Sequence, residues 1–228
     1  MPEAIHVVFA LYPNITQLDF TGPFEVLRRV PNVRLIVASR EGGRLSADSG
    51  LVFADLTTLQ DVAACDVLCV VGGAGQVAAL ADAAFMAEVR RLGQRARYVT
   101  SVCTGSLILA GAGLITGKRA ACHWAWRDLL SDAGAIPEPG RVVRDGNVIT
   151  GGGVTAGIDF ALTVAAELAG QDVAQAIQLS IEYDPAPPFD SGTPEKAPAQ
   201  VLKLVRARIA ALYPERKAAM AAALARGV

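Results

Sequence analysis

The stretch YVTSVCTGSLILAGAGLITG, residues 98–117, decides the fold. It carries no charged residue and is long enough to cross a bilayer as a helix. However, its first half is polar, with Thr100, Ser101 and Thr104, and glycines interrupt the second half. The pattern therefore predicts a buried strand, a sharp turn at Cys103 and a buried helix, and it argues against a membrane span.

Short apolar runs of the same kind recur on both sides of this stretch and alternate with amphipathic segments. The segment that follows the first run has Pro23, which suits the first turn of a helix. A single helix with Leu80, Phe85, Val89 and Leu92 is expected after the glycines at 72–75. Strands are predicted at residues 5–11, 33–39, 66–71 and 97–102, and hairpins near 42–53 and at 141–150, where Asp145-Gly146 forms the turn.

Glycines at 151–153 lead into a further buried helix that ends near Gly170. Strands that alternate with helices at this spacing predict a doubly wound α/β fold, with a mostly parallel sheet and helices on both faces. Ligands in such folds bind beyond the carboxyl ends of the strands. Functional residues are therefore expected near Asp19, Gly72-Gly73 and Cys103, which follow strands at that edge.

Length and composition limit the class of protein. The chain has 228 residues, enough for one large domain or a domain with an extension. Hydrophobic residues make up 52%, and 21 Lys and Arg residues nearly balance 22 Asp and Glu residues, so a disordered chain and a polybasic nucleic-acid binder are excluded. We expect an α/β domain at residues 1–183, with a proline-rich arm and a helical extension of the same domain at 184–228.

The compartment and the metal content follow from further features. The first residues have Glu3 before a short apolar run and lack the basic start and cleavage site of a secretory signal, which indicates the cytoplasm. Reduced thiols are expected there. Cys65 and Cys69 have no second pair, and the histidines are His6 and His123, so the sequence predicts neither a metal site nor a cofactor.

The motif Ser101-Val102-Cys103-Thr104-Gly105 is the strongest functional signal. Small residues around a thiol at a strand-to-helix junction are typical of the sharp elbow that presents a nucleophile. The start of the following helix should stabilise the thiolate and lower the pKa of Cys103 below its ordinary value of about 8.5. The alternative is a buried, inert cysteine that happens to end a strand.

Three further positions have two interpretations each. Gly72 and Gly73 could supply backbone N–H groups to a ligand, or they could only form a turn. Asp19 could exchange a proton with the thiol, or it could cap a helix. His123 could orient or deprotonate the thiol, or it could cap or pack beside Trp124.

The segments LDFTGP, VVGGAG, SVCTGSLILAGAGLITGKRAACHW and DGNVITGGGVTAGIDFAL resemble, in this order, the ThiJ/PfpI superfamily of class I glutamine-amidotransferase-like folds. Within it, they and QLSIEYDPAPPFDSGTP are most similar to the isocyanide hydratase branch. The resemblance implies a flavodoxin-like domain, a homodimer, the nucleophile Cys103 and the acidic partner Asp19. It also implies that Thr104 hydrogen-bonds near the site.

The implied reaction adds water to an isocyanide, R–N≡C, and gives an N-substituted formamide through a covalent cysteine thioimidate, without a cofactor. Chemically, Asp19 would protonate the electron-rich carbon as the Cys103 thiolate attacks it. The expected partners are therefore a small isocyanide, water and a second copy of the chain, with no nucleic acid and no membrane.

Departures from other branches weaken other activities. Proteases and glyoxalase-like members of the superfamily usually have histidine after the cysteine, where this chain has Thr104, and amidotransferases need a histidine later than His123. The remaining alternative is a cysteine-based small-molecule or redox sensor, or a stress-response module, related to the sensor domains of AraC-type regulators. Those regulators have an additional helix-turn-helix region, for which the chain after Gly170 is short.

Overall fold

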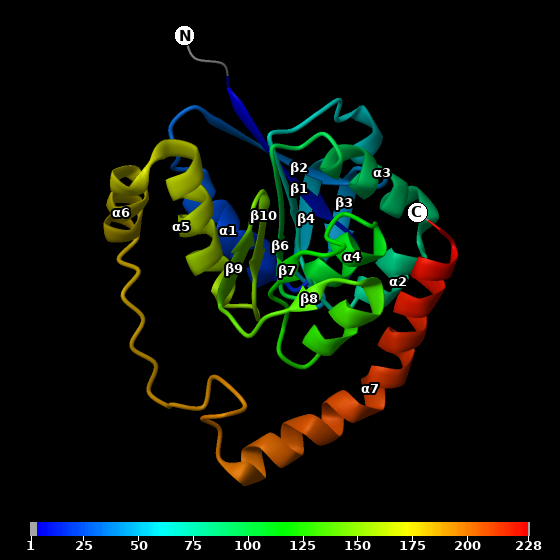
Figure 1. Cartoon of the computed structure of the whole chain (residues 1–228). Helices are drawn as coiled ribbons and strands as arrows, with labels where there is room; N and C mark the ends of the chain where they lie inside the picture. Colours follow the sequence, from blue (N-terminus) through cyan, green and yellow to red (C-terminus); the bar gives the residue numbers. More distant parts are fainter. Residues whose placement is uncertain (1–3, 228) are drawn as a thin grey trace.

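The computed structural model describes residues 4–227 and contains one main sheet with helices on both faces (Figure 1). The strands are β1 (Ile5–Leu11), β2 (Val33–Ser39), β3 (Gly43–Ser46), β4 (Val52–Thr58), β5 (Val67–Val70), β6 (Tyr98–Val102), β7 (Arg119–Ala120), β8 (Ile136–Pro137), β9 (Val142–Asp145) and β10 (Val148–Gly151). The helices are α1 (Gln17–Leu27), α2 (Gln76–Ala81), α3 (Ala83–Gly93), α4 (Gly105–Gly111), α5 (Ala156–Ala169), α6 (Gln171–Ser180) and α7 (Ala199–Ala225). Short 3₁₀ segments occupy Leu59–Asp61 and Arg127–Ala133.

The order of strands in the main sheet is β3-β4-β2-β1-β5-β6-β10-β9. All neighbours from β4 to β10 are parallel, and the edge strands β3 and β9 pair antiparallel with β4 and β10. The prediction of a doubly wound, mostly parallel α/β fold is therefore confirmed. The central strands β1, β5, β6 and β10 all end at the same edge of the sheet, so the loops that follow them lie close together.

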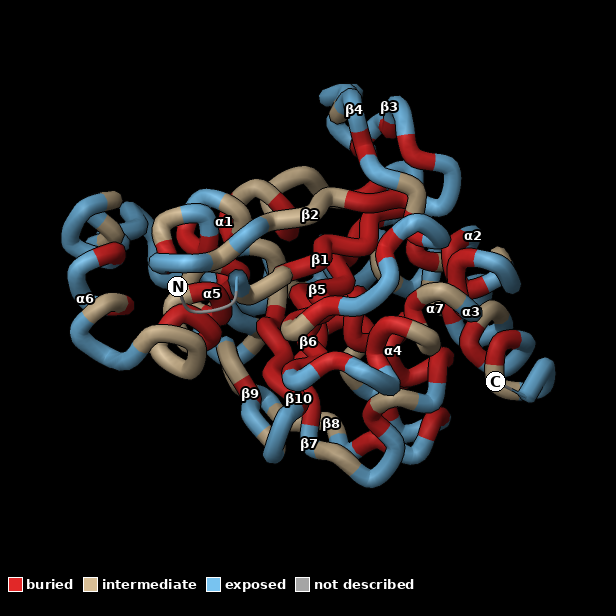
Figure 2. Tube along the Cα trace, turned by 90° about the horizontal axis from the view of Figure 1, so that it is seen from above, coloured by how far each residue is buried: buried red, intermediate tan, exposed pale blue. Residues whose placement is uncertain are grey.

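Each face of the sheet is covered by its own group of helices. Helices α1 and α5 pack together on one face, with α6 outside α5, while α2, α3, α4 and α7 are packed on the other (Figure 1). Figure 2 shows the central strands as buried and the β3–β4 hairpin as a partly exposed projection. The residues after β5 and β6 therefore lie in the interior of the molecule.

The stretch at residues 98–117 folds as predicted, with β6 followed by the fully buried helix α4. Both faces of this segment are covered by protein, which explains its lack of charge. Within residues 4–227, no helix combines the length and the apolar character that a membrane crossing requires.

Two predicted helices differ in their boundaries. Helix α1 begins at Gln17, so Pro23 lies inside the helix and the prediction that it occupies the first turn is wrong. The single helix expected after the glycines is two helices, α2 and α3, because Asp82 adopts an extended conformation between them. The Asp82 side chain accepts hydrogen bonds from the N–H groups of Ala84 and Phe85 and so starts α3.

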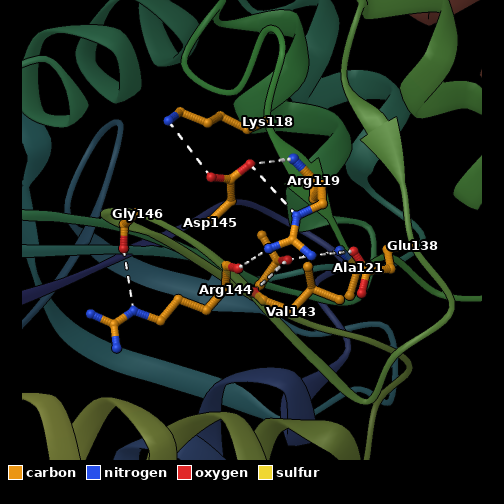
Figure 3. A network of polar contacts seen from close by, with 9 residues as sticks. Lys118, Arg119, Ala121, Glu138, Val143, Arg144, Asp145 and Gly146 are labelled. Atoms are coloured by element: carbon orange, nitrogen blue, oxygen red, sulfur yellow. Dashed lines mark hydrogen bonds and ion pairs between the residues drawn. The ribbon is translucent and has the colours of Figure 1, made fainter.

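The β9–β10 hairpin is held against the short strand β7 by polar contacts (Figure 3). Asp145 accepts a hydrogen bond of 3.0 Å from the backbone N–H of Arg119. The Arg119 side chain contacts Glu138 and donates to the carbonyl oxygen of Arg144. These contacts fix the path of the chain through β7 to His123, at the edge where β10 ends.

The C-terminal part leaves the sheet and then returns to it. An irregular, exposed segment at residues 184–198 connects α6 on one face with α7 on the other (Figure 1). The first half of α7 is exposed, whereas Arg216, Met220 and Ala223 in its second half are buried. The predicted proline-rich segment and helical tail are thus present.

Candidate active site

Cys103 lies at a strained turn between β6 and α4. Its φ angle is 58°, in the left-handed region that residues other than glycine rarely adopt. Its backbone N–H donates to the carbonyl oxygens of Gly151 and Gly152, at 3.1 and 2.8 Å. A Cβ atom at Gly105 would lie 2.1 Å from the carbonyl oxygen of Val70, so only glycine fits after the turn. The predicted elbow is confirmed in its geometry.

Asp19, in the first turn of α1, is completely buried, with an exposed fraction of 0%. Its Oδ2 accepts a hydrogen bond of 3.1 Å from the N–H of Gly72, while its Oδ1 has no nitrogen or oxygen partner among the described residues. Burial raises the pKa of Asp19 from 3.8 to about 7, against the smaller, lowering effects of the Cys103 thiol and the Gly72 N–H. Asp19 therefore changes its protonation state near neutral pH, as a proton shuttle requires.

The Gly72-Gly73 turn connects Asp19 with Thr104. The N–H of Gly73 donates to Thr104 Oγ1 at 3.1 Å, so the N–H groups of both glycines bind protein side chains and are not free for a ligand. A Cβ atom at Gly72 would lie 2.6 Å from the backbone nitrogen of Thr104 and 2.7 Å from Asp19 Oδ2. The turn therefore holds the carboxyl group and the residue after the nucleophile close together.

The predicted lowering of the Cys103 pKa is wrong for the free site. Burial, with the nearby Asp19 as a second cause, raises the pKa of this thiol well above its ordinary value. The side chain is only 5% exposed, although its surroundings include the polar groups of Asp19 and Thr104. Burial therefore favours the protonated form of Cys103.

His123 lies apart from this cluster. Its Nδ1 accepts a hydrogen bond of 3.3 Å from the N–H of Ala125, and its ring stacks on that of Trp124, with 5.7 Å between the centroids. These contacts correspond to the capping and packing interpretation. The structure shows no hydrogen bond between His123 and Cys103 among the described residues.

A cavity of about 620 Å³ adjoins the elbow. Gly152, whose carbonyl oxygen binds the N–H of Cys103, lies in its wall together with Cys122 and His123. The segment 192–195 of the proline-rich arm closes another side. The arm therefore contributes to a cavity next to the elbow, although Cys103 and Asp19 do not themselves line it.

Three further buried residues near the cluster were not predicted from the sequence. Tyr12 follows β1 and donates from its hydroxyl group to the carbonyl oxygen of Val71. Gln76 and Arg216 are hydrogen-bonded to each other at 2.6 Å, although they lie on α2 and α7. Gln76 directly follows the glycine-rich turn, which is a usable signal, but Arg216 is one of several basic residues in an alanine-rich helix.

The fold and the elbow together define a class, the flavodoxin-like α/β proteins in which a cysteine follows a sheet strand at a strained turn. The sequence specifies the family. Residues 5–167 match the DJ-1/PfpI family, and the chain belongs to it.

Comparison with individual proteins gives relatives of two kinds. The chain is 51% identical over 207 residues to isonitrile hydratase from Pseudomonas putida, covering 91% of both proteins. It is also similar to a solved ThiJ/PfpI family protein from Pseudomonas syringae, with a TM-score of 0.93 and 39% identity, over 95% of this chain and 90% of the other. The HTH-type transcriptional regulator CdhR from Pseudomonas aeruginosa is 30% identical over 185 residues, 77% of this chain but 53% of the regulator.

Proposed function

We propose that this protein is an isonitrile hydratase, which converts an isocyanide and water to an N-substituted formamide. The observation that carries the proposal is the 51% identity to the Pseudomonas putida isonitrile hydratase over 91% of each chain. The similarity extends over 207 residues and so is not limited to the elbow motif at residues 101–105. The roles of Cys103 and Asp19 in this reaction are proposed on the geometry of the site.

The first step forms a covalent bond between Cys103 and the terminal carbon of the isocyanide. The thiol gives its proton to the Asp19 carboxylate, and the carboxyl group delivers a proton to the carbon as the sulfur bonds to it. The product is the thioimidate R–N=CH–S–Cys103, and Asp19 is again a carboxylate. A pKa of about 7 for Asp19 suits both directions of this transfer.

The second step hydrolyses the thioimidate. Asp19 takes a proton from water while the water oxygen bonds to the thioimidate carbon, and the nitrogen receives that proton. The tetrahedral species R–NH–CH(OH)–S–Cys103 then loses its C–S bond. The hydroxyl proton passes to the sulfur through Asp19, and the formamide R–NH–CHO leaves. Thr104 and the Gly72-Gly73 turn hold Asp19 beside the sulfur throughout.

The cavity beside Gly152 is the proposed binding place for the R group. A volume of about 620 Å³ lies within the usual range for small-molecule sites. Its wall includes the apolar side chains of Trp124, Val154 and Pro139 and the charged side chains of Arg127, Arg141 and Glu195. We therefore expect apolar R groups, including aromatic ones, to be accepted.

An assay for formamide tests the proposal directly. Purified protein is mixed with a simple aromatic isocyanide, and the formamide is quantified by chromatography, with Cys103→Ser as the control. Wild-type protein should form product catalytically, and the variant should not. Mass spectrometry of rapidly quenched samples should show the mass of the isocyanide added to Cys103. The absence of formamide with aromatic and aliphatic isocyanides alike would contradict the proposed activity.

The alternative, a redox sensor, is less well supported. Both functions use the same buried thiol, but the similarity to the hydratase covers 91% of each chain, whereas that to the regulator CdhR covers 53% of the regulator. Titration with hydrogen peroxide distinguishes the two functions. In a sensor, low concentrations of hydrogen peroxide should oxidise Cys103 stoichiometrically. In a hydratase, such concentrations should leave Cys103 reduced, and the protein should still turn over isocyanide.

We also propose that the protein acts as a homodimer. Apolar side chains at helical spacing form an exposed stripe on the first half of α7. They are Val201, Leu204, Val205 and Leu212. A second copy of the chain, as the family resemblance implies, would cover this stripe.

The proposed location is the cytoplasm, and the four cysteines, which are all free thiols, are compatible with its reducing conditions. We further propose that residues 184–228 extend the domain 1–183 and do not fold separately. The support is that Met220 and Ala223 of α7 are buried within the same hydrophobic core as the sheet.

A further inference from the structure

Arg216 is a buried cation on the second half of α7, with an exposed fraction of 8%. One nitrogen of its guanidinium donates to Gln76 Oε1 at 2.6 Å, and another donates to the carbonyl oxygen of Gly73 at 3.4 Å. The guanidinium carbon lies over the Trp126 ring, 4.5 Å from the centroid. Among residues 4–227, no carboxylate forms an ion pair with it.

These contacts join the C-terminal helix to the site. Gly73 binds Arg216 through its carbonyl oxygen and Thr104 through its N–H group. Gln76 is fixed to the same turn, because its N–H donates to the carbonyl oxygen of Gly73 at 3.3 Å. Arg216 therefore restrains the turn that holds Asp19 and Thr104 in place.

The charge of Arg216 is difficult to explain by packing alone. A buried charge without an ionic partner destabilises a folded protein, and a neutral side chain could fill the same space on Trp126. The positive charge instead lies within electrostatic range of Tyr12, Cys103 and Cys122, and of Glu215 next to it on α7. When Cys103 loses its proton, the resulting thiolate is the anion that this cation can stabilise.

The other groups around Cys103 cannot supply that positive charge. Asp19, Tyr12 and Cys122 are neutral or negative in all their protonation states, and they face the thiol from α1, from the end of β1 and from the segment after β7. The pKa of His123, at the wall of the cavity, is lowered by burial and by Arg216, which favours its neutral form at neutral pH. Two permanent cations remain: Arg127, which borders the cavity and acts on Cys122, and Arg216, which is buried and hydrogen-bonded to the Gly72-Gly73 turn.

We propose that Arg216 is a positioning residue that fixes the Gly72-Gly73 turn and acts as the counter-cation of the Cys103 thiolate. Its catalytic consequence rests on the proposed hydratase function, but its effect on the thiol does not. The C-terminal helix therefore belongs to the site through one side chain, although it lies 143 positions from Gly73 in the sequence.

The test is the pH dependence of Cys103 alkylation by iodoacetamide, measured by peptide mass spectrometry in the full chain. In Arg216→Gln the midpoint of alkylation should rise by about one pH unit or more, which is a loss of about tenfold in rate at neutral pH. Arg216→Lys should keep most of the wild-type midpoint, because it keeps the charge. In parallel, kcat/KM for an aromatic isocyanide should fall in Arg216→Gln mainly through kcat.

Met220→Ala is the matched control, because this buried residue lies one turn further along α7 and carries no charge. It should lower the melting temperature and leave the alkylation midpoint unchanged. If Arg216→Gln does not fold, Arg216→Met replaces it, since its unbranched side chain can pack on Trp126. The proposal would be overturned if Arg216→Gln and Arg216→Met kept the wild-type midpoint of alkylation. It would also be overturned if Arg216→Lys or Met220→Ala shifted that midpoint as much as Arg216→Gln does. If the wild-type protein has no hydratase activity, the proposed function is refuted. The alkylation midpoints would then still test the effect of Arg216 on the Cys103 thiol.

Discussion

At the scale of single residues, the environment that suits Asp19 to proton transfer also destabilises the fold. Its pKa is raised from 3.8 to about 7 because its charged form is buried. The raised pKa means that the folded protein holds the Asp19 proton more tightly than the unfolded chain does. The stability linked to this proton is therefore complete below about pH 4, decreases as the pH rises and is lost above about pH 7. The rise in pKa corresponds to about 4 kcal/mol of unfolding free energy at most.

Asp19→Asn should consequently stabilise the protein at pH 8, by about 1–4 kcal/mol, and have little effect near pH 4. The asparagine keeps an oxygen that can accept from the N–H of Gly72. Urea unfolding at the two pH values measures the difference. The exposed Asp172→Asn is the control, and an Asp19→Asn variant that is less stable than the wild type at pH 8 would contradict the prediction.

The same Asp19→Asn variant should be nearly inactive as a hydratase. Removal of a general acid and base reduces rates by about 10²-fold or more, so kcat should fall by that factor. Steady-state kinetics with an aromatic isocyanide measures it. Full activity in this variant would remove Asp19 from the mechanism and would leave Cys103 as an independent nucleophile.

The sequence predicted the residues of the elbow well but not the protonation of its thiol. Cys103, Asp19 and Thr104 follow or precede strands in recognisable local motifs, and the structure brings them together. The pKa of Cys103 depends on how deeply the whole fold buries it, and burial outweighed the expected effect of the helix start. Local sequence contains no measure of that burial.

At the scale of elements, the break between α2 and α3 depends on one side chain. Asp82 Oδ1 accepts from the N–H groups of Ala84 and Phe85, at 3.1 Å each. Asp82→Ala should therefore destabilise the protein by about 1 kcal/mol. Thermal or urea unfolding measures this, with Asp172→Ala in the first turn of α6 as the control, because that residue makes no capping hydrogen bond. Equal effects of the two substitutions would show that the cap of α3 contributes nothing.

The packing of α4 against β5 depends on Gly105. A Cβ atom there would overlap the backbone carbonyl group of Val70, which cannot rotate away. Gly105→Ala should cost about 3 kcal/mol or more and disturb the elbow, so both stability and activity should fall. Gly192→Ala is a suitable control for stability, because nothing lies within 4 Å of a Cβ atom at that position. A Gly105→Ala protein of wild-type stability would contradict the contact.

Strands were easier to predict than helix boundaries for a physical reason. Buried parallel strands such as β1 and β2 are short, continuous apolar runs, and their predicted limits agree with the structure. Helix α1 starts earlier than expected because tertiary packing tolerates Pro23 in its interior. The strands β7 and β8 have two residues each, too few for a periodic pattern, and were not predicted. Helix α6 is amphipathic but was not predicted either.

At the scale of the whole molecule, the exposed stripe on α7 predicts how two chains associate. Leu204→Asp should place a charge within the proposed dimer contact and convert the dimer to a monomer. Sedimentation velocity measures the molecular mass in solution. The control is Lys203→Asp, which introduces the same negative charge at an exposed neighbour outside the four apolar residues of the stripe. A wild-type protein that is already monomeric, or a Leu204→Asp protein that remains dimeric, would contradict the assignment of this surface.

Long-range relations were the least predictable part of the molecule. Composition indicated that the tail is helical, but no local signal indicates that Arg216 reaches Gly73 or that segment 192–195 borders the cavity. Both depend on the irregular arm carrying the chain from one face of the sheet to the other. Because the arm is exposed and irregular, its own sequence has no pattern that indicates its contacts, and these depend on the complete fold.

The return of α7 to the Gly72-Gly73 turn also affects how the protein matures during translation. Domains form from the N-terminus as the chain leaves the ribosome. The sheet, the elbow and the thiol can therefore assemble while residues near 216 are still inside the exit tunnel, but the contact between Arg216 and Gly73 cannot. A chain that has formed the sheet but not this contact would therefore hold the Gly72-Gly73 turn without the hydrogen bond that Arg216 donates to Gly73.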